Sequence, residues 1–528
     1  MDLIINNLRI AVEKDGMDEY LKAASQRLKI NEQDVRFVKI LSKSLDASCE
    51  DQFYYELSIV VTAPDTFDNS ENLPGYIEDI KEDRQAKKNK ERPIIVGFGP
   101  AGMFAALELI DYGIKPIIFE RGKKIEERSI DVQRFIKERV LDPESNIQFG
   151  EGGAGSYSDG KLFSRTKTKN SKYINRVLDT FIKFGAPEEI GYVSKPHLGT
   201  DVLCRIVRNI RSYILERGGE IHYGSKLTDI IITDDKISGV VVNGEREYRS
   251  SILYLAVGHS ARDSFEMFQR KGIAIEQKPI SVGVRVEHPV ETINLIRYGN
   301  KYKEFSGIGA ATYSFNYTNR RVGRGVNTFC MCPGGEVVNA SSEDGMAVVN
   351  GMSYSGRSSE FSNSALVVTC HTNDYKSTDP LAGIEFQRDI ERKAFNAGGG
   401  RWEVPAQNLV DFLSGRSSVD LNKNSFKMGA ASADMKEIFP KFISEALLNA
   451  FKSWEEDYPL FVSDHAILLG AETRTSSPVR IKRSERYESV NIKNLYPIGE
   501  GSGYTGGITS SAADAIKAVE ASLATIGG

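Results

Sequence analysis

Short apolar runs alternate with glycine-rich turns and amphipathic stretches along this chain. The first complete unit covers residues 93–122: the apolar run Ile94–Val96 leads into Gly97, a helical stretch follows, and a second apolar run ends at Phe119. This order predicts a strand, a glycine turn, a helix and a second strand. We therefore expect a βαβ unit at the start of a parallel sheet, typical of α/β proteins.

The glycines of this unit have the spacing GxGxxG. In such a turn the first glycine permits the tight bend, the second lets the backbone approach a pyrophosphate, and the third lets the helix pack close to the strand. An acid at the end of the second strand can accept hydrogen bonds from an adenosine ribose. Together these features predict a dinucleotide site, the alternative being a glycine-rich turn without a ligand. The expected binding residues are Gly97, Gly99, Pro100, Ala101, Gly102, Glu120 and Arg121.

A second glycine-rich segment covers residues 148–165, QFGEGGAGSYSDGKLFSR. Its five glycines and three serines indicate close approach of the backbone to a ligand, with N–H groups and hydroxyls as donors to a pyrophosphate and flavin. Gly153, Ser156 and Ser158 are the candidates. A long flexible loop is the alternative, because Gly/Ser-rich composition also suits linkers.

Residues 171–258 read as alternating helices and strands. Helices are expected over 171–184 and 202–217, the second capped by Thr200 or Asp201, and a strand over 220–223. From Leu227 to Leu255 short β stretches follow, with a two-residue hairpin turn at 243–244. Ligands bind at the carboxyl ends of parallel strands, so Gly258 is expected against the same cofactor, and Leu227 is a further candidate contact.

The middle of the chain, 273 to about 459, contains no second GxGxxG after a strand. It predicts an inserted substrate domain of mixed sheet, turning helical between 381 and 454. Cys330 and Cys332 are a candidate redox pair, although a disulfide across one residue is strained; buried structural cysteines are the alternative. Arg285 and His371 are further catalytic candidates.

The C-terminal portion contains further candidate contacts to the cofactor. Arg474, beside a Ser-Ser-Pro turn, is a candidate for holding an anionic substrate or the flavin, the alternative being an ion pair with Glu472. A strand, a glycine-rich loop and a helix follow, in which Glu500 is placed to hold a sugar-chain hydroxyl and the helix N-terminus to stabilise negative charge on a reduced flavin. The expected contacts are Gly499, Glu500, Gly506, Gly507 and Ile508.

The first 80 residues predict a small α+β domain. Strands are expected over 3–12, 35–41 and 53–61 and a helix over 17–28, followed by a charged linker over 81–92. Eight Lys and Arg stand against 16 Asp and Glu in residues 1–80, which argues against binding to RNA phosphates. A role in protein docking or oligomerisation is expected instead.

Composition limits the class of protein. The chain has 528 residues, a mass of 58.6 kDa, 40% hydrophobic residues and a formal net charge of −4, so it is globular with roughly three or four domains and no basic field that would favour nucleic acid. No apolar run reaches the roughly 20 residues of a membrane helix, and no signal peptide is evident. Five scattered cysteines suit a reducing compartment, and no metal site is predicted. A cytoplasmic location is expected.

The chain resembles the two-dinucleotide-binding-domain flavoproteins, and more closely the bacterial FAD-dependent dehydrogenases described as NAD/FAD-utilising. The resemblance covers nearly the whole chain and rests on IIVGFGPAG with Glu120, GEGGAGSYSDGKL, KPHLGTD, YLAVGHSARD, FCMCPGG, ETRTSSPVRI and YPIGEGSGYTGGI. It implies non-covalent FAD, with the adenosine at 97–102, the flavin near the C-terminal loop and an active site facing the inserted domain. The superfamily usually carries Asp where this chain has Glu500, and the chain lacks the CxxxxC motif of disulfide reductases.

These expectations combine into one prediction. The fold is α/β: a Rossmann-like FAD domain built from 93–272 and 465–528, an inserted mixed α+β domain over 273–464, and the N-terminal α+β domain over 1–80. The function is hydride transfer between an unknown small-molecule substrate and flavin N5, with NADH or NADPH as a transient electron donor. A non-enzymatic FAD-binding or sensing protein and an FAD-dependent RNA-modifying enzyme are the alternatives.

Overall fold

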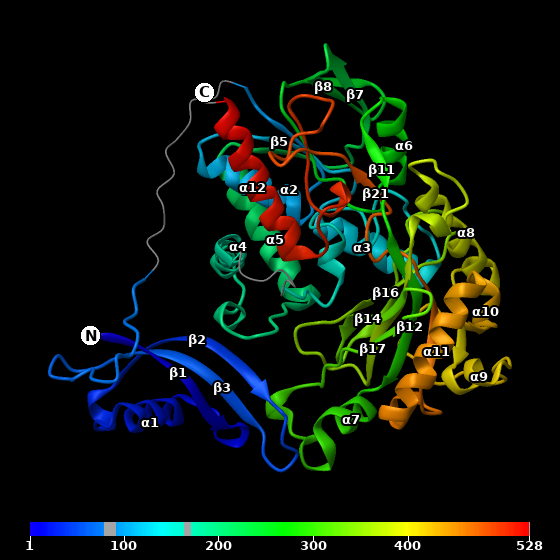
Figure 1. Ribbon diagram of the computed structural model, residues 1–528. Coiled ribbons are helices and arrows are strands. Elements are labelled where there is room, and N and C mark those ends of the chain that lie inside the picture. The colour runs from blue at the N-terminus through cyan, green and yellow to red at the C-terminus, as the bar shows by residue number, and fades with distance from the viewer. Residues whose placement is uncertain (79–90, 163–170, 527–528) are drawn as a thin grey trace.

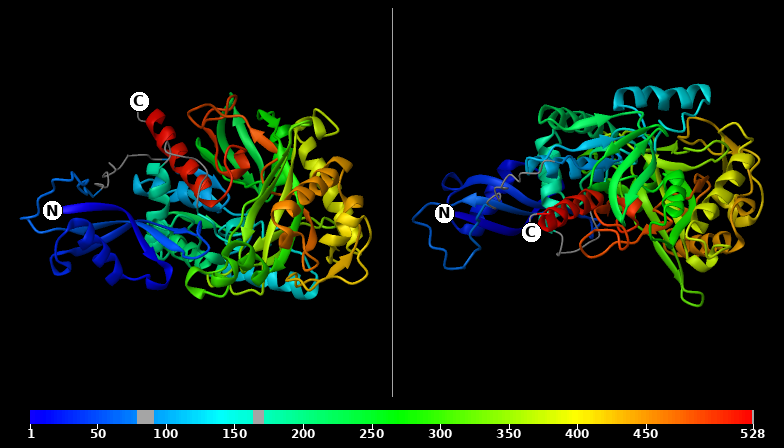
Figure 2. Two further views of the ribbon diagram at one scale, coloured as in Figure 1. Left: turned by 60° about the horizontal axis from the view of Figure 1, so that its bottom comes forward. Right: turned by 90° about the horizontal axis from the view of Figure 1, so that it is seen from above.

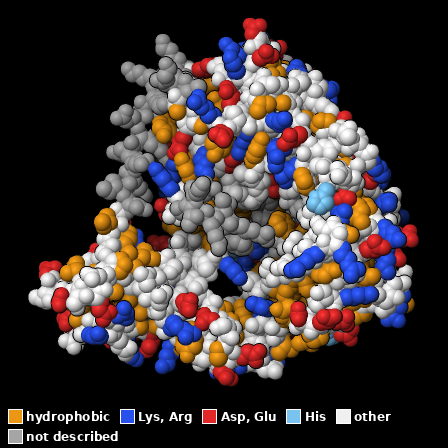
Figure 3. All heavy atoms as spheres, viewed as in Figure 1, with side chains coloured by type: hydrophobic (Ala, Val, Ile, Leu, Met, Phe, Trp, Pro, Cys, Tyr) orange, Lys and Arg blue, Asp and Glu red, His pale blue; other side chains and the backbone are white. Residues whose placement is uncertain are grey.

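The computed structural model describes residues 1–78, 91–162 and 171–526. A small N-terminal domain stands beside a larger body built on two main sheets (Figures 1 and 2). The linker expected over 81–92 lies almost wholly outside the described residues, as do residues 163–165 of the second glycine-rich segment. Acidic and basic side chains are interspersed on the face shown in Figure 3, in keeping with the near-neutral net charge.

The N-terminal domain is the α+β unit that the sequence predicts. Its antiparallel sheet has the order β1-β3-β2, and one helix packs apolar residues such as Tyr20, Ala24 and Leu28 against it. The second strand continues five residues beyond the expected end at 41. The elements are β1 (Asp2–Ala11), α1 (Met17–Leu28), β2 (Arg36–Asp46) and β3 (Tyr54–Thr62).

This domain contacts the rest of the chain at two places. Phe53, 1% exposed, stacks on Tyr302 with 4.1 Å between ring centroids, and the Tyr302 hydroxyl donates to Glu13 at 2.6 Å. On the other side, the N–H of Lys43 donates to the carbonyl of Tyr192 at 2.8 Å. The small domain therefore connects two parts of the body that are distant in sequence.

Replacing Phe53 by Ala is expected to loosen this connection. Truncating a buried Phe costs about 3–5 kcal/mol, and here the loss falls on the contact between domains. Hydrogen exchange should increase over residues 53–62 and 298–302 in the variant. Val38→Ala, at a position 40% exposed on β2, is the control, and equal exchange in both variants would contradict the assignment.

The first main sheet is parallel and is assembled from strands far apart in the sequence. Its order is β22-β10-β4-β5-β6, and Leu253 pairs with Ile94 on one side and with Leu495 on the other. The strands are β4 (Ile94–Val96), β5 (Ile117–Phe119), β6 (Glu220–His222), β10 (Leu253–Leu255) and β22 (Leu495–Pro497). A parallel sheet needs cover on both faces, which explains the continuous apolar runs.

Different elements cover the two faces of this sheet. Ile95 points into a core with α2 (Pro100–Asp111), α4 (Ser171–Lys183), α5 (Gly199–Glu216) and α12 (Ile508–Ile526). Ile94 and Val96 point into a second core with α6 (Arg262–Arg270) and a three-stranded antiparallel sheet, β7 (Leu227–Thr233), β8 (Lys236–Val242) and β9 (Arg246–Arg249). Helix α3 (Ile125–Glu138) follows β5.

The second main sheet has seven strands in the order β13-β14-β17-β12-β20-β18-β19. Val282, Val284 and Val286 alternate along its central strand and pack with the helices of one face. The strands are β12 (Ile280–Pro289), β13 (Asn316–Asn319), β14 (Arg324–Cys332), β17 (Phe361–Cys370), β18 (Val404–Asn408), β19 (Ala430–Ser432) and β20 (Ile467–Glu472).

Helices and two short pairs of strands complete this part of the chain. The helices are α7 (Val290–Tyr302), α8 (Ala382–Ala397), α9 (Leu409–Ser414), α10 (Met435–Ile438) and α11 (Lys441–Asp457). A hairpin, β15 (Glu336–Asn339) with β16 (Val349–Met352), packs against the face of the sheet opposite α11. The pair β11 (Ile275–Gln277) and β21 (Val479–Ile481) lies where the chain passes between the two main sheets.

Four expectations differ from the structure. Strand β20 belongs to the seven-stranded sheet, so this part of the chain extends past the expected boundary at 464, and β18 and β19 interrupt the stretch 381–454 expected to be helical. The hairpin loop after Val242 holds three residues rather than two. The helix caps expected at Thr200 or Asp201 do not form, because α5 already begins at Gly199. The Thr200 hydroxyl donates to the Ser158 carbonyl instead, and the Asp201 carboxylate accepts from Ser355.

Candidate cofactor-binding and active site

The first glycine turn is closed by backbone on both sides. Gly97 has φ +97°, and a Cβ atom there would lie 2.3 Å from the Ala256 carbonyl oxygen at the end of β10. A Cβ at Gly102, in the first turn of α2, would lie 1.9 Å from the Gly97 oxygen. Neither position accepts a side chain, because real Cβ atoms do not approach backbone oxygen so closely. Helix α2 therefore starts directly against strands β4 and β10.

Glu120 holds this turn together. Its carboxylate is 4% exposed and accepts from the N–H of Phe98 at 2.8 Å, of Gly122 at 2.9 Å and of Gly150 at 3.0 Å. A carboxylate offers about four lone-pair sites, so three are taken by backbone. Glu120 thus ties the turn, its own strand end and the second glycine-rich loop into one unit, a role that the sequence did not indicate.

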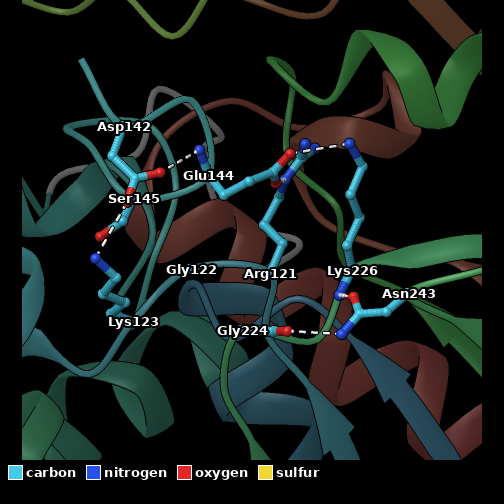
Figure 4. Close-up of a pocket in the computed structure, with 9 residues that line it drawn as sticks. All are labelled: Arg121, Gly122, Lys123, Asp142, Glu144, Ser145, Gly224, Lys226 and Asn243. Atoms are coloured by element: carbon cyan, nitrogen blue, oxygen red, sulfur yellow. Dashed lines mark hydrogen bonds and ion pairs between the residues drawn. The ribbon is translucent and has the colours of Figure 1, made fainter. Parts of the chain in front are cut away.

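A pocket of about 220 Å³ opens beside Glu120 (Figure 4). The Arg121 guanidinium lies over the Phe149 ring at 4.1 Å and donates to Asp263 at 2.9 and 3.0 Å and to Glu144 at 2.6 Å. Lys226 also bonds Glu144, at 2.9 Å. Burial alone would raise the pKa of Asp263, but Arg121 and Lys226 lower it to about 2. The pocket wall is therefore a network of paired charges.

The second glycine-rich loop is built around a residue that sequence reasoning missed. Arg128 on α3 is fully buried, and a run of residues before η3 (Ala154–Tyr157) folds around it. Its guanidinium donates to the carbonyls of Asn146, Ile147, Gly150, Glu151 and Gly153 at 2.7–3.3 Å. An arginine within a helix gives no sequence signal for this role. The loop is thus ordered by one side chain, in contrast to the alternative of a flexible segment.

The hydroxyls of Ser156 and Ser158 in this loop have different hydrogen-bond surroundings. The Ser158 hydroxyl donates to the Gly155 carbonyl at 2.8 Å and accepts from the N–H of Gly160 at 3.0 Å. The Ser156 hydroxyl is buried, and among the described residues it has no hydrogen-bond partner. The expectation that both point donors at a ligand is therefore wrong for Ser158, whose hydroxyl closes its own turn. Gly153 lies beside Gly99, where a Cβ added to Gly99 would be 3.5 Å from its Cα.

The C-terminal loop returns to the same edge of the parallel sheet. The N–H of Gly499 donates to Asp514 at 2.9 Å, and Asp514 is held by Arg483 at 2.6 and 2.9 Å. A Cβ at Gly501, in η8 (Glu500–Ser502), would lie 2.7 Å from the Gly258 oxygen. The expected contact residues after β10 and β22 are therefore adjacent. Leu227 is buried at the start of β7 in the core below the sheet.

Glu500 lies in this loop next to the start of α12. The side chain is half-buried, and burial raises its pKa to about 7, although Lys278 and the backbone N–H of Gly507 oppose the rise. Gly506 is close, since a Cβ there would be 3.7 Å from a Glu500 carboxylate oxygen. Glu500, Gly506, Gly507 and Ile508 thus surround one helix N-terminus, which favours negative charge.

The structure brings Arg285 together with the two cysteines, of which Cys330 is exposed and Cys332 is buried. Arg285 is fully buried and forms a two-pronged ion pair with Glu472 at 2.6 and 2.9 Å, and it donates to the Cys330 carbonyl at 3.2 Å. The Cys332 thiol is buried and donates to the Cys330 carbonyl at 3.3 Å, and both cysteines are free thiols. Burial raises the pKa of Cys332, which disfavours the reactive thiolate. His371 is exposed and lies after Cys370, which pairs with Ile280 five residues away from Arg285.

Arg474 belongs to a separate buried cluster. It donates to Glu391 at 3.0 and 3.2 Å, Arg262 donates to the same carboxylate at 2.7 and 2.8 Å, and Thr473 donates at 2.6 Å. Glu391 lies on α8 and Arg262 on α6, so the cluster joins both halves of the body. The expected alternative partner, Glu472, bonds Arg285 instead. Arg474 is therefore neutralised within the protein, which weakens its role as an anion holder.

Two features are absent from the residues that the structure describes. None of their helices combines the length and apolar composition needed to cross a bilayer. They also hold no group of three or more His, Cys, Asp or Glu side chains arranged to bind a metal ion.

The solved structures that align with this chain have low similarity to it. One alignment is to CtdE in complex with FAD, 13% identical, covering 83% of this chain and 86% of that one, with a TM-score of 0.31. Another is to the halogenase PltM, 10% identical, covering 83% and 70%, with a TM-score of 0.37. A third is to the tetracycline destructase Tet(51), 9% identical, covering 83% and 82%, with a TM-score of 0.33. Likenesses at these TM-scores indicate nothing specific about this chain.

Sequence comparison is more decisive. Residues 279–475 match the family model described as FAD-dependent protein, C-terminal domain-like. An uncharacterised protein of Clostridium beijerinckii is 42% identical over 529 residues, covering 98% of this chain and 98% of its own length. The family match ends three residues after β20, in agreement with the extent of the seven-stranded sheet. The chain therefore belongs to one family with the Clostridium protein, and the domain match within it supports an FAD-dependent flavoprotein.

Proposed function

We propose that this FAD-dependent enzyme is an oxidoreductase that transfers hydride between a small-molecule substrate and flavin N5. The observation that carries the proposal is the meeting of three backbone loops at the carboxyl edge of the parallel sheet: the turn after β4, the end of β10 at Gly258, and the loop after β22. Such an edge, at the point where the strand order reverses, is where α/β sheets bind ligands.

The residues present fit FAD. Gly97 and Gly102 leave room only for backbone, so a pyrophosphate can approach the N-terminus of α2. Glu120 keeps one lone-pair site for a ribose hydroxyl, and the charged pocket at Arg121 lies beside it for the adenosine end. Glu500 and the N-terminus of α12 suit the flavin end, where charge develops on reduction.

The chemistry divides between the cofactor and the chain. When bound, FAD supplies two-electron chemistry, with hydride accepted or released at N5. The N-terminus of α12 stabilises the negative charge of the reduced state. The loop between β15 and β16 bonds the second glycine-rich loop, and the segment after β20 joins the cluster of Arg262. We infer that these two segments exclude water from the edge and orient the substrate. NADH or NADPH is proposed as a transient donor that docks beside the flavin.

The test is direct. We expect the purified protein to be yellow, with flavin absorbance that bleaches under dithionite and a cofactor released on denaturation that is FAD. Stopped-flow mixing with NADH and with NADPH measures whether either reduces it. Colourless protein that binds no added FAD would refute the proposal, whereas bound FAD that neither nucleotide reduces would remove only the donor.

A further inference from the structure

A chain of hydrogen bonds crosses the proposed active site and ends on a histidine without a described role. The amide nitrogen of Gln148 donates to the Ala340 carbonyl at 3.3 Å, the Ser260 hydroxyl donates to the Gln148 amide oxygen at 3.2 Å, and Ser260 Oγ lies 2.9 Å from His259 Nδ1. Gln148 and Ser260 are each 6% exposed. The chain runs from the hairpin β15–β16 through the second glycine-rich loop to the end of β10.

The directions of these bonds follow from one fixed end. A backbone carbonyl only accepts, so the Gln148 group facing Ala340 is the NH₂, and the group facing Ser260 is the oxygen. That oxygen only accepts, so Ser260 gives it the hydroxyl proton. Ser260 Oγ is then left as an acceptor toward His259, and Nδ1 must carry the proton. The neutral ring therefore has its lone pair on Nε2.

The charges around His259 keep the ring neutral. Burial lowers its pKa to about 3, helped by the nearby cations Arg474, Arg262 and Lys278 and opposed by Glu391. Among the described residues, Nε2 has no hydrogen-bond partner. His259 directly follows Gly258, which packs against Gly501 in the loop of Glu500. A histidine with an unprotonated, unpartnered Nε2 thus directly follows the glycine that packs against the loop proposed for the flavin end.

We propose that His259 is the base of the reaction, and that the substrate class is alcohols or amines that lose a proton together with hydride. The C–H bond breaks and its electron pair leaves as hydride to FAD; the O–H or N–H bond breaks and its proton goes to Nε2; a C=O or C=N bond forms. The enzyme then holds the hydride on the cofactor and the proton on an imidazolium. The negative charge of the reduced flavin must offset the burial and the cations that lower the pKa of His259 before reduction. This inference rests on the proposed function.

The first experiment determines the protonation state and tautomer of the His259 ring without any substrate. NMR of protein labelled with ¹⁵N-histidine, with His259 assigned by its loss in His259→Gln, is expected to show the neutral Nδ1–H tautomer at about pH 7. In Ser260→Ala, Nδ1 loses its acceptor and the tautomers should mix. A protonated ring, or the Nε2–H tautomer, in the wild type would overturn the proposal. The measurement is made on the protein as purified, so it stands even if FAD binding fails.

The second experiment follows the proton. If His259 is protonated when the flavin is reduced, the midpoint potential of the holoenzyme should fall more steeply with pH than that of His259→Gln. The extra uptake of one proton per two electrons corresponds to a slope steeper by about 29.6 mV per pH unit, between about pH 6 and 8. His197→Gln, at another half-buried histidine, should keep the wild-type slope. Equal slopes in wild type and His259→Gln would refute the base. Absence of bound FAD would instead refute the proposed function.

Discussion

Replacing Glu391 by Gln is expected to cost about 3–5 kcal/mol of unfolding free energy. Glu391 is fully buried and accepts both nitrogen forks of Arg262 and Arg474. The variant leaves these two guanidinium groups in the interior with one shared counter-charge, the partly exposed Glu343. Breaking a buried ion pair by removing one partner costs this much because the remaining charge stays desolvated. The urea midpoint, followed by tryptophan fluorescence, measures the loss.

The pH dependence of this loss has a definite sign. Burial alone would raise the pKa of Glu391, but the two arginines hold it far below its usual value. The ion pair therefore contributes fully above the unfolded pKa of about 4.3, and its contribution falls as the pH drops below that value. The difference between wild type and Glu391→Gln should be constant between about pH 6 and 8 and should shrink as the medium becomes more acidic.

A matched control lies on the same helix. Glu385 on α8 bonds Arg388 at 2.8 Å, but its side chain is 62% exposed. Exposed pairs contribute about 0–1 kcal/mol, so Glu385→Gln should leave the midpoint nearly unchanged. Equal losses in the two variants would mean that the Glu391 cluster contributes no more to stability than a surface pair.

The Glu391 cluster contains an ion pair that the sequence did not predict. Arg474 is predicted as a site residue from its place beside a Ser-Ser-Pro turn, and that role stays a prediction. Its partner Glu391 lies 83 residues away in the chain, on a helix whose pattern is that of any amphipathic helix. Pairings of this kind depend on how elements pack in space, so charge at one position cannot indicate whether it is free or neutralised.

Local features were predicted well where backbone geometry alone decides them. The βαβ unit over 93–122 and the helix over 17–28 form as expected, because apolar period and glycine spacing act over a few residues. The hydrogen bonds of Ser158 were not predicted, and the caps predicted for α5 at Thr200 or Asp201 do not form. In both cases a side chain had a choice of backbone partners, and the choice was made by segments as distant as Ser355.

The position of Glu120 was predicted, but the hydrogen-bond partners of its carboxylate were not. The acid at the end of the second strand was expected from the motif, and it is there, but its carboxylate binds three backbone N–H groups. The motif therefore specifies the loop structure as much as the ligand. A substitution that disturbs this turn should affect folding and FAD binding together, so the two effects are measured separately after a change at a single backbone contact.

Gly102→Ala provides that change, and it is expected to weaken FAD binding at least about tenfold, or 1.4 kcal/mol. The added Cβ would lie 1.9 Å from the Gly97 carbonyl oxygen, so α2 must move away from the turn and its N-terminus away from the pyrophosphate. Titration of FAD, followed by flavin fluorescence, measures the affinity, and thermal unfolding of the protein without cofactor measures the folding cost.

The control for this variant is Gly356→Ala, where a Cβ meets nothing within 4 Å and the backbone is not in the left-handed region. It should retain wild-type affinity and stability. Overpacking typically costs about 1–3 kcal/mol, so Gly102→Ala is expected to unfold earlier even without FAD. Unchanged FAD affinity in Gly102→Ala would place the pyrophosphate elsewhere on the sheet edge. It would leave Glu120 with only the structural role that its three backbone hydrogen bonds already show.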